Sequence, residues 1–161
     1  MCSSDLKIMF GEEGRARLVD LGLADLLGRS AWREPSSLDN HVVRYSAPEQ
    51  ALGRVPAPAI DIYALGLVLV EAVTGSVPFD AGSTVATLAQ RVDRLMPASA
   101  DLGPLAAVLE HAARPEADER WTAEEFHHAL VALAPRLPRP EALPLATRTI
   151  AGRTTAEIAA A

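Results

Sequence analysis

The stretch from Ile60 to Thr74 constrains the fold most, because its residues are apolar on nearly every face of a helix. A helix that is apolar all round is usually a buried one. Gly75 follows directly and suits a helix C-cap, since glycine adopts the left-handed conformation without steric cost. The run is shorter than the roughly 20 residues of a membrane span, and it contains Glu71. We therefore expect a central buried helix and no membrane segment in this chain.

Three more helices are expected after the central one. The segment from Ser83 to Leu95 carries apolar residues at helical spacing, and Leu102 to Ala113 forms the next helix. Thr122 and Glu125 have the spacing of a capping box, which opens the fourth helix. The side chains expected to point inward are Val85, Leu88, Ala89, Val92 and Leu95 in the first of these helices, and Phe126, Ala129, Leu130 and Leu133 in the last.

The parts before and after these helices have a different character. Two short runs, 8–10 and 15–19, flank a turn with two glycines and predict a β-hairpin. Residues 20–49 mix Gly, Ser, Pro and Asp without periodicity, and a loop this long inside a domain is usually functional. From Pro135 the prolines recur without an apolar stripe, so we expect 135–161 to be a linker or disordered tail. Residues 1–6 match nothing that follows, and we interpret them as a non-native leader.

The charge and cysteine content exclude some functions. The net charge is -6 and the pI is about 5.2, which disfavours nucleic-acid binding because that role needs a basic face. Cys2 is the single cysteine and cannot form an internal disulfide, which fits a reducing cytoplasm. The four histidines have no partners at metal-ligand spacing, and His127 and His128 point about 100° apart on a helix.

Three motifs occur in a fixed order along the chain. Residues 18–24 read LVDLGLA, residues 44–50 read RYSAPEQ, and residues 61–66 read DIYALG and continue into the central helix. Each motif alone is a weak signal, but their order and spacing together resemble the C-terminal lobe of a bacterial serine/threonine protein kinase. The resemblance covers about residues 7–134. It implies a mainly α fold: a kinase-like C-lobe fragment with a short β-hairpin, a long activation-type loop and four main helices.

The resemblance assigns roles to several residues. Asp20 matches the aspartate that holds magnesium on the phosphates of ATP. Glu49 matches the glutamate of a structural ion pair, with Arg120 as its partner. Asp61 matches the aspartate at the start of the central helix, where it can act as N-cap and, in the family, steadies the catalytic loop. Glu71 aligns with a position that some members use to contact basic substrate side chains; a solvated or structural glutamate is an equally good interpretation.

The long loop contains three candidate phosphorylation sites, because the family is often phosphorylated there. A phosphate adds charge that arginines can dock, which orders a loop. Serines in a polar loop are also ordinary, and both interpretations stay open. The residues are Ser30, Ser36 and Ser37.

Family catalysis needs parts that these 161 residues do not contain. There is no G-x-G and no HRD-type run. Lys7, the only lysine, stands where the family has a magnesium-binding asparagine, and a cation there would repel the metal. The family also has Gly-Thr before the tyrosine of the second motif, whereas this chain has His41 and Val42, and valine makes no side-chain hydrogen bond.

Three functional hypotheses follow. In the first, the parent protein uses magnesium and ATP to phosphorylate a protein substrate, and this chain is an inactive piece of it that binds neither cofactor. In the second, the chain is a pseudokinase-type module that binds a regulatory partner. In the third, it is a helical interaction domain unrelated to kinases, which a Glu49–Arg120 contact would exclude. We also expect apolar surface to stay uncovered on the central helix, because the helix that precedes it in the family is not in the chain.

Overall fold

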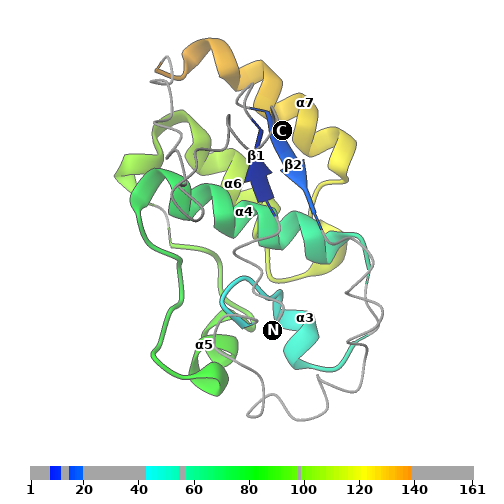
Figure 1. Ribbon diagram of the computed structural model, residues 1–161. Coiled ribbons are helices and arrows are strands. Elements are labelled where there is room, and N and C mark those ends of the chain that lie inside the picture. The colour runs from blue at the N-terminus through cyan, green and yellow to red at the C-terminus, as the bar shows by residue number, and fades with distance from the viewer. Residues whose placement is uncertain (1–7, 12–14, 20–42, 55–56, 98, 139–161) are drawn as a thin grey trace, which may run out of the picture.

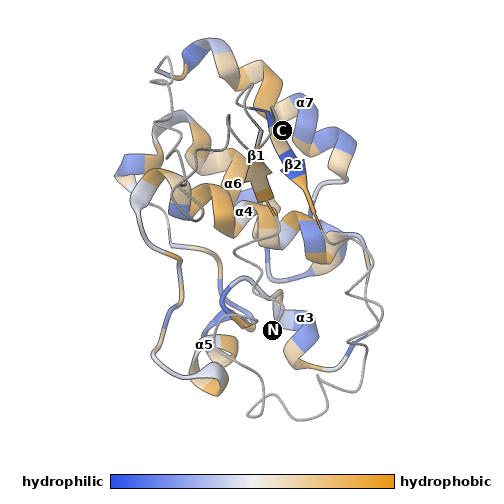
Figure 2. Cartoon of the chain, in the orientation of Figure 1, coloured by the Kyte–Doolittle hydropathy of each residue, from blue (hydrophilic) through white to orange (hydrophobic). Residues whose placement is uncertain are grey.

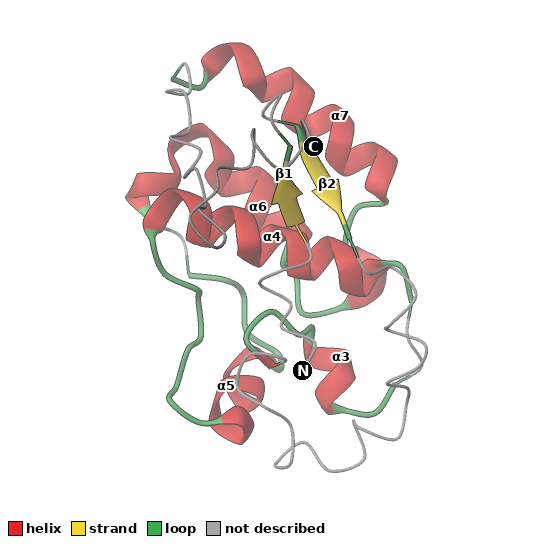
Figure 3. Cartoon of the chain, viewed as in Figure 1, coloured by secondary structure: helices red, strands yellow, loops and turns green. Residues whose placement is uncertain are grey.

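The computed structural model describes residues 8–11, 15–19, 43–54, 57–97 and 99–138. The part of the chain that it describes is mainly helical, with one two-stranded sheet (Figures 1 and 3). The elements, in chain order, are β1 (Ile8–Phe10), β2 (Ala16–Leu18), α3 (Pro48–Ala51), α4 (Ala59–Thr74), α5 (Thr84–Arg91), η4 (Ala100–Leu105), α6 (Ala106–Ala112), η5 (Ala117–Glu119), α7 (Ala123–Leu133) and η6 (Ala134–Arg136); those marked η are 3-10 helices.

The predicted hairpin is present. Strands β1 and β2 pair antiparallel, with Ile8 opposite Leu18 and Phe10 opposite Ala16. Its apolar side chains remain largely in solvent, since Met9 is 56% exposed and Leu18 is 64% exposed. In the described residues the hairpin is therefore held by its ladder rather than by burial of these two side chains.

Helix α4 forms the centre of the apolar core and packs against α6. Its C-cap is Gly75, in the left-handed conformation at φ 75°, as the sequence predicts. Gly66 lies against α6, where a Cβ at this position would come within 3.3 Å of the Cβ of Ala112. Leu67 and Ala112 are both fully buried. The close approach of the two helices depends on small side chains at this crossing.

Some apolar side chains of α4 are not buried. Leu65 is 36% exposed and Val73 is 44% exposed, and Figure 2 shows apolar residues along much of this helix. The prediction of burial on nearly all faces is therefore wrong at Leu65 and Val73, and these two side chains leave apolar surface uncovered, as expected. Among the described residues, no helix has the length and apolar character needed to cross a bilayer.

The fourth predicted helix, α7, begins as the sequence indicates. The Thr122 hydroxyl accepts from the Glu125 amide at 3.2 Å, while the Glu125 carboxylate accepts from the Thr122 amide at 2.8 Å. The bonds from the amide and the hydroxyl of Thr122 lower the pKa of Glu125. Phe126 is 2% exposed, and Ala129, Leu130 and Leu133 pack on the same core.

The structure corrects the end and the buried face of the helix predicted from Ser83 to Leu95. Helix α5 ends at Arg91, and Asp93 turns the chain with φ 54°. Val85 and Leu95, both predicted to point inward, are 57% and 58% exposed. The buried face instead consists of Thr87, Leu88 and Arg91. The predicted stripe is right at Leu88 and wrong at Val85, Ala89 and Leu95, because Arg91 rather than an apolar residue completes the buried face.

Two further differences concern helix boundaries. The predicted helix 102–113 begins as 3-10 turns in η4, kinks at Gly103 with φ 47°, and becomes α-helical only in α6. Pro104 follows the kink and cannot donate a backbone hydrogen bond. A short helix, α3, also precedes the four predicted ones.

Residues 139–161 lie outside the described residues, and the domain boundaries at 7 and 134 stay predictions.

Replacing Gly66 by valine tests the α4–α6 contact. Gly66→Val adds three carbons where one Cβ already meets Ala112 at 3.3 Å, so we expect the free energy of unfolding to fall by about 1–3 kcal/mol. Urea denaturation followed by far-UV circular dichroism measures this change. The control is Ala72→Val on the exposed face of the same helix, for which we expect a loss below about 1 kcal/mol. Equal stability of Gly66→Val and the parent chain would contradict the prediction.

Candidate functional site

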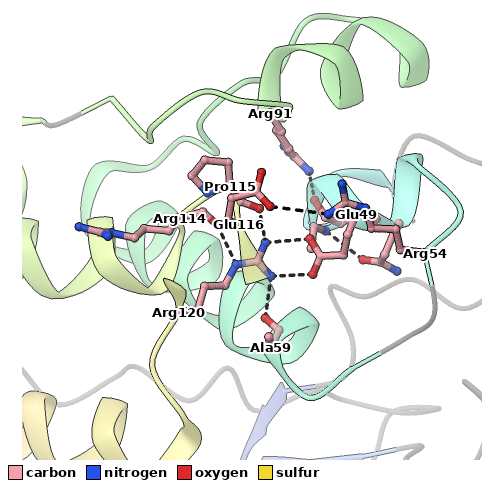
Figure 4. Close-up of polar contacts among 11 residues, drawn as sticks. Glu49, Arg54, Ala59, Arg91, Arg114, Pro115, Glu116 and Arg120 are labelled. Carbon is pink, nitrogen blue, oxygen red and sulfur yellow. Dashed lines mark hydrogen bonds and ion pairs between the residues drawn. The ribbon is translucent and has the colours of Figure 1, made fainter. Parts of the chain in front are cut away.

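The strongest polar contact in the described structure joins Glu49 in α3 to Arg120, which follows η5. The two guanidinium Nη atoms donate to the two carboxylate oxygens at 2.7 Å each (Figure 4). The Arg120 side chain is 0% exposed and that of Glu49 is 5% exposed. The pair predicted from the sequence is therefore present, and it is bidentate and buried.

Arg120 uses its remaining donors on backbone carbonyls. Its Nε donates to the oxygen of Arg114 at 2.7 Å, and its Nη atoms donate to those of Ala59 at 2.9 Å and Pro115 at 2.8 Å. A guanidinium has five N–H donors, and with the two bonds to Glu49 all five are used. Arg120 thus ties α3 to the first residue of α4 and to the loop after α6, as the dashed lines in Figure 4 show.

The ring of Tyr63 lies next to this pair. Its centroid is 4.8 Å from the guanidinium carbon of Arg120, which is a cation–π distance. The Tyr63 hydroxyl is buried, and among the described residues it has no hydrogen-bond partner. Burial raises the pKa of Tyr63 to about 12, against the opposing influence of Arg91 and Arg120. The phenol therefore stays neutral at any physiological pH and serves as a packing surface.

A second buried arginine, Arg91, has no counterpart in the sequence predictions. It is fully buried, and it donates to the carbonyls of Val43 and Ser46 at 2.8 Å each and to that of Arg44 at 2.5 Å. Burial lowers its pKa, whereas Tyr63 and Asp80 oppose that shift. The signal that could have found it is weak: an arginine one turn after Thr87 and Leu88 on a short helix.

Glu71 of α4 is engaged by the same segment. Its Oε1 accepts from Arg44 Nη2 at 2.7 Å, and its Oε2 accepts from the Tyr45 hydroxyl at 2.5 Å. The side chains of Arg44 and Glu71 are 35% and 28% exposed. Both carboxylate oxygens therefore have partners within the chain, which is the arrangement of a structural glutamate. A contact between Glu71 and a substrate stays a prediction.

The structure corrects the local role of Asp61. Helix α4 begins at Ala59 with Pro58 as N-cap, so Asp61 lies in the first turn and makes no capping bond. The reason is that Pro58 already has helical dihedral angles, and its carbonyl accepts from the Asp61 amide at 3.1 Å. The carboxylate is exposed. Its charge near the positive helix end is still favourable, by about 0.3–1 kcal/mol.

Several predicted site residues lie outside the described residues. They are the candidate magnesium ligand Asp20 and the candidate phosphorylation sites Ser30, Ser36 and Ser37. Within the described ranges, no three histidine, cysteine or acidic side chains are placed to hold a metal ion. His111 stacks on Trp121 with ring centroids 4.2 Å apart. The described residues thus form a scaffold around α4.

Breaking the central pair should be strongly destabilising. Glu49→Gln leaves Arg120 as an uncompensated buried charge, so we expect a loss of about 3–5 kcal/mol in the free energy of unfolding. Urea denaturation measures this loss. The matched control is Arg54→Gln, which breaks the exposed Arg54–Glu116 pair at 3.6 Å and should cost under about 1 kcal/mol. Similar losses in the two variants would show that burial does not govern the Glu49–Arg120 pair.

Removing the Tyr63 hydroxyl should not destabilise the protein. Tyr63→Phe keeps the ring under Arg120 and removes a buried group that has no partner. A buried unsatisfied polar group costs about 1–3 kcal/mol, so we expect the free energy of unfolding to stay the same or to rise. Tyr45→Phe is the matched comparison, because that hydroxyl donates to Glu71, and this variant should be less stable. A large loss of stability in Tyr63→Phe would mean that the hydroxyl has a partner in solution.

Comparison with known proteins agrees with this arrangement. The model of the protein kinase domain matches residues 3–135. The serine/threonine-protein kinase PkaA of Streptomyces coelicolor is 33% identical over 130 residues, which is 77% of this chain and 23% of that protein. The serine/threonine-protein kinase PrkC of Bacillus subtilis is 33% identical over 97 residues, which is 60% of this chain and 15% of that protein. The chain therefore spans under a quarter of the length of either relative, and it belongs to the protein kinase family.

Proposed function

We propose that this chain is the part of a serine/threonine protein kinase that supports the catalytic residues and faces the protein substrate. The observation that carries the proposal is the buried Glu49–Arg120 pair, with Nη–Oε distances of 2.7 Å. It fixes the end of the long loop against the start of the central helix. Together with the family match over residues 3–135, this supports a kinase lower lobe more than a general helical module.

In this proposal the acidic residues have separate roles. Asp20 holds magnesium, which in turn binds the phosphates of ATP. Asp61, whose carboxylate is exposed at the start of α4, is available to accept hydrogen bonds from a catalytic loop. Magnesium and ATP supply the phosphoryl group and the charge that stabilises its transfer.

The single cysteine of the chain favours the cytoplasm as the location of this protein.

The same proposal makes the 161 residues inactive by themselves. They contain no G-x-G flap, no HRD-type aspartate and no lysine other than Lys7. Phosphoryl transfer depends on these groups for positioning and for charge stabilisation. Phosphorylation of Ser30, Ser36 or Ser37 would then be carried out by an extended form of the protein or by another kinase.

Phosphate transfer from labelled ATP tests both halves of the proposal. With magnesium present, we expect no transfer from the purified chain, and we expect transfer to serine or threonine from a protein extended by the upstream sequence of its gene. Asp20→Asn in the extended protein should lower the rate by about 100-fold or more, because a metal ligand is lost. Asp118→Asn removes an exposed carboxylate elsewhere and should leave the rate unchanged. Transfer by the 161-residue chain alone would refute its inactivity.

A pseudokinase-type module is the second candidate. The observation that favours it is Val42, which stands where the family has a threonine that contacts the catalytic aspartate. A protein of this kind would hold a regulatory partner without transferring phosphate. An extended protein that carries an HRD aspartate and an upstream lysine but shows no transfer, with activity gained in Val42→Thr, would support this candidate over the first.

A further inference from the structure

A small pocket lies between the turn that contains Arg44 and the start of α5. Its volume is about 120 Å³, and the charged residues in its lining are Arg44, Asp80 and Arg91. Ser83 and Thr87, which carry hydroxyl groups, also line it. The two arginines and one aspartate give the lining residues a net charge of +1, and the share that comes from Arg44 is paired with Glu71, which lies outside the lining.

Arg44 reaches this pocket with an unused donor group. Its Nη2 donates to Glu71 at 2.7 Å, and no described residue accepts from its Nη1. The side chain is 35% exposed, and Arg44 lines the pocket. Arg91 lies behind the turn, fully buried, and adds positive charge that solvent screens little.

The hydroxyl groups add further donors. Ser83 Oγ accepts from the Ala86 amide at 3.3 Å, and Thr87 Oγ1 accepts from the Ala81 amide at 3.2 Å. Each hydroxyl can accept and donate at once, so their hydrogens can be given to a ligand. The pocket thus offers N–H and O–H donors around a cation, which suits an anionic oxygen.

Glu71 cannot select a basic ligand in this arrangement. Arg44 and the Tyr45 hydroxyl occupy its two oxygens at 2.7 Å and 2.5 Å. A basic ligand would have to displace both partners before it could bind the carboxylate. Glu71 is therefore unavailable to a basic ligand, whereas Arg44 Nη1 and the buried guanidinium of Arg91 favour a negatively charged ligand in the pocket.

We propose that the pocket receives an acidic side chain of a bound polypeptide and that Arg44 Nη1 contacts it. The inference rests on the proposed function, because the polypeptide is the protein substrate, and it adds a preference for acidic residues in that substrate. Asp80 at the pocket edge is exposed and opposes the ligand. Its carboxylate therefore limits the affinity.

Three labelled peptides test the proposal with the 161-residue chain itself. They are identical except at one central position, which is Glu, Gln or Lys, and binding is measured by fluorescence anisotropy. We expect the Glu peptide to bind about three to five times more tightly than the Gln peptide, as for one exposed ion pair. The difference should disappear near 1 M salt, where the screening length is about 3 Å.

Matched variants locate the preference. Arg44→Gln should abolish it, whereas Arg94→Gln removes the same charge from an exposed residue outside the pocket and should keep it. Asp80→Asn and Glu71→Gln each remove an opposing carboxylate and should increase the affinity for the Glu peptide. Asp80→Asn leaves the Arg44–Glu71 pair intact, so it decides the question if Arg44→Gln does not fold.

Three results would overturn the proposal: tightest binding of the Lys peptide, an unchanged preference for Glu in a folded Arg44→Gln variant, or no binding of any peptide. The first result, with weaker Lys-peptide binding in Glu71→Gln, would assign Glu71 to basic substrates instead. None of the three results depends on phosphate transfer. Failure of this proposal is therefore distinguishable from failure of the proposed function.

Discussion

The contact of Arg120 with Glu49 is the constraint on which the arrangement of the irregular segments depends. It joins positions 71 residues apart, and the same guanidinium also binds the carbonyls of Ala59, Arg114 and Pro115. Helix α3 has four residues and η5 has three, so neither buries enough apolar surface to fix its own place. A rigid, planar cation with five donors can fix several such segments at once.

Arg91 solves the same problem for the turn at residues 43–46. Backbone carbonyls in a buried turn need donors, and the irregular residues 43–46 cannot satisfy all of their own. Arg91 supplies donors to three of them from α5. The cost of burying its charge appears as the lowered pKa of Arg91. The described part of the chain therefore combines an apolar core around α4 with buried polar contacts made by Arg91 and Arg120.

The sequence predicted features whose cause is local or lies in a recognised motif. The Gly75 cap, the box of Thr122 and Glu125 and the hairpin each depend on a few neighbouring residues. The Glu49–Arg120 pair was found through the motif, because spacing alone says nothing about a contact over 71 residues. The fold class follows from these elements and from the family match.

The features that the sequence did not predict depend on tertiary structure. The first turn of α4 starts at Ala59 because Pro58 is already helical, which displaces Asp61 from the cap. The buried face of α5 is determined by Arg91, whose acceptors lie 45 to 48 residues earlier in the chain. An apolar stripe cannot reveal a buried arginine, because hydrophobic periodicity assigns every charged residue to the surface. The position of Arg91 also has a consequence for Glu71: the backbone that Arg91 holds carries Arg44 and Tyr45, whose side chains neutralise that carboxylate. The two residues that engage the Glu71 carboxylate of α4 are therefore positioned from α5, through three hydrogen bonds to backbone atoms.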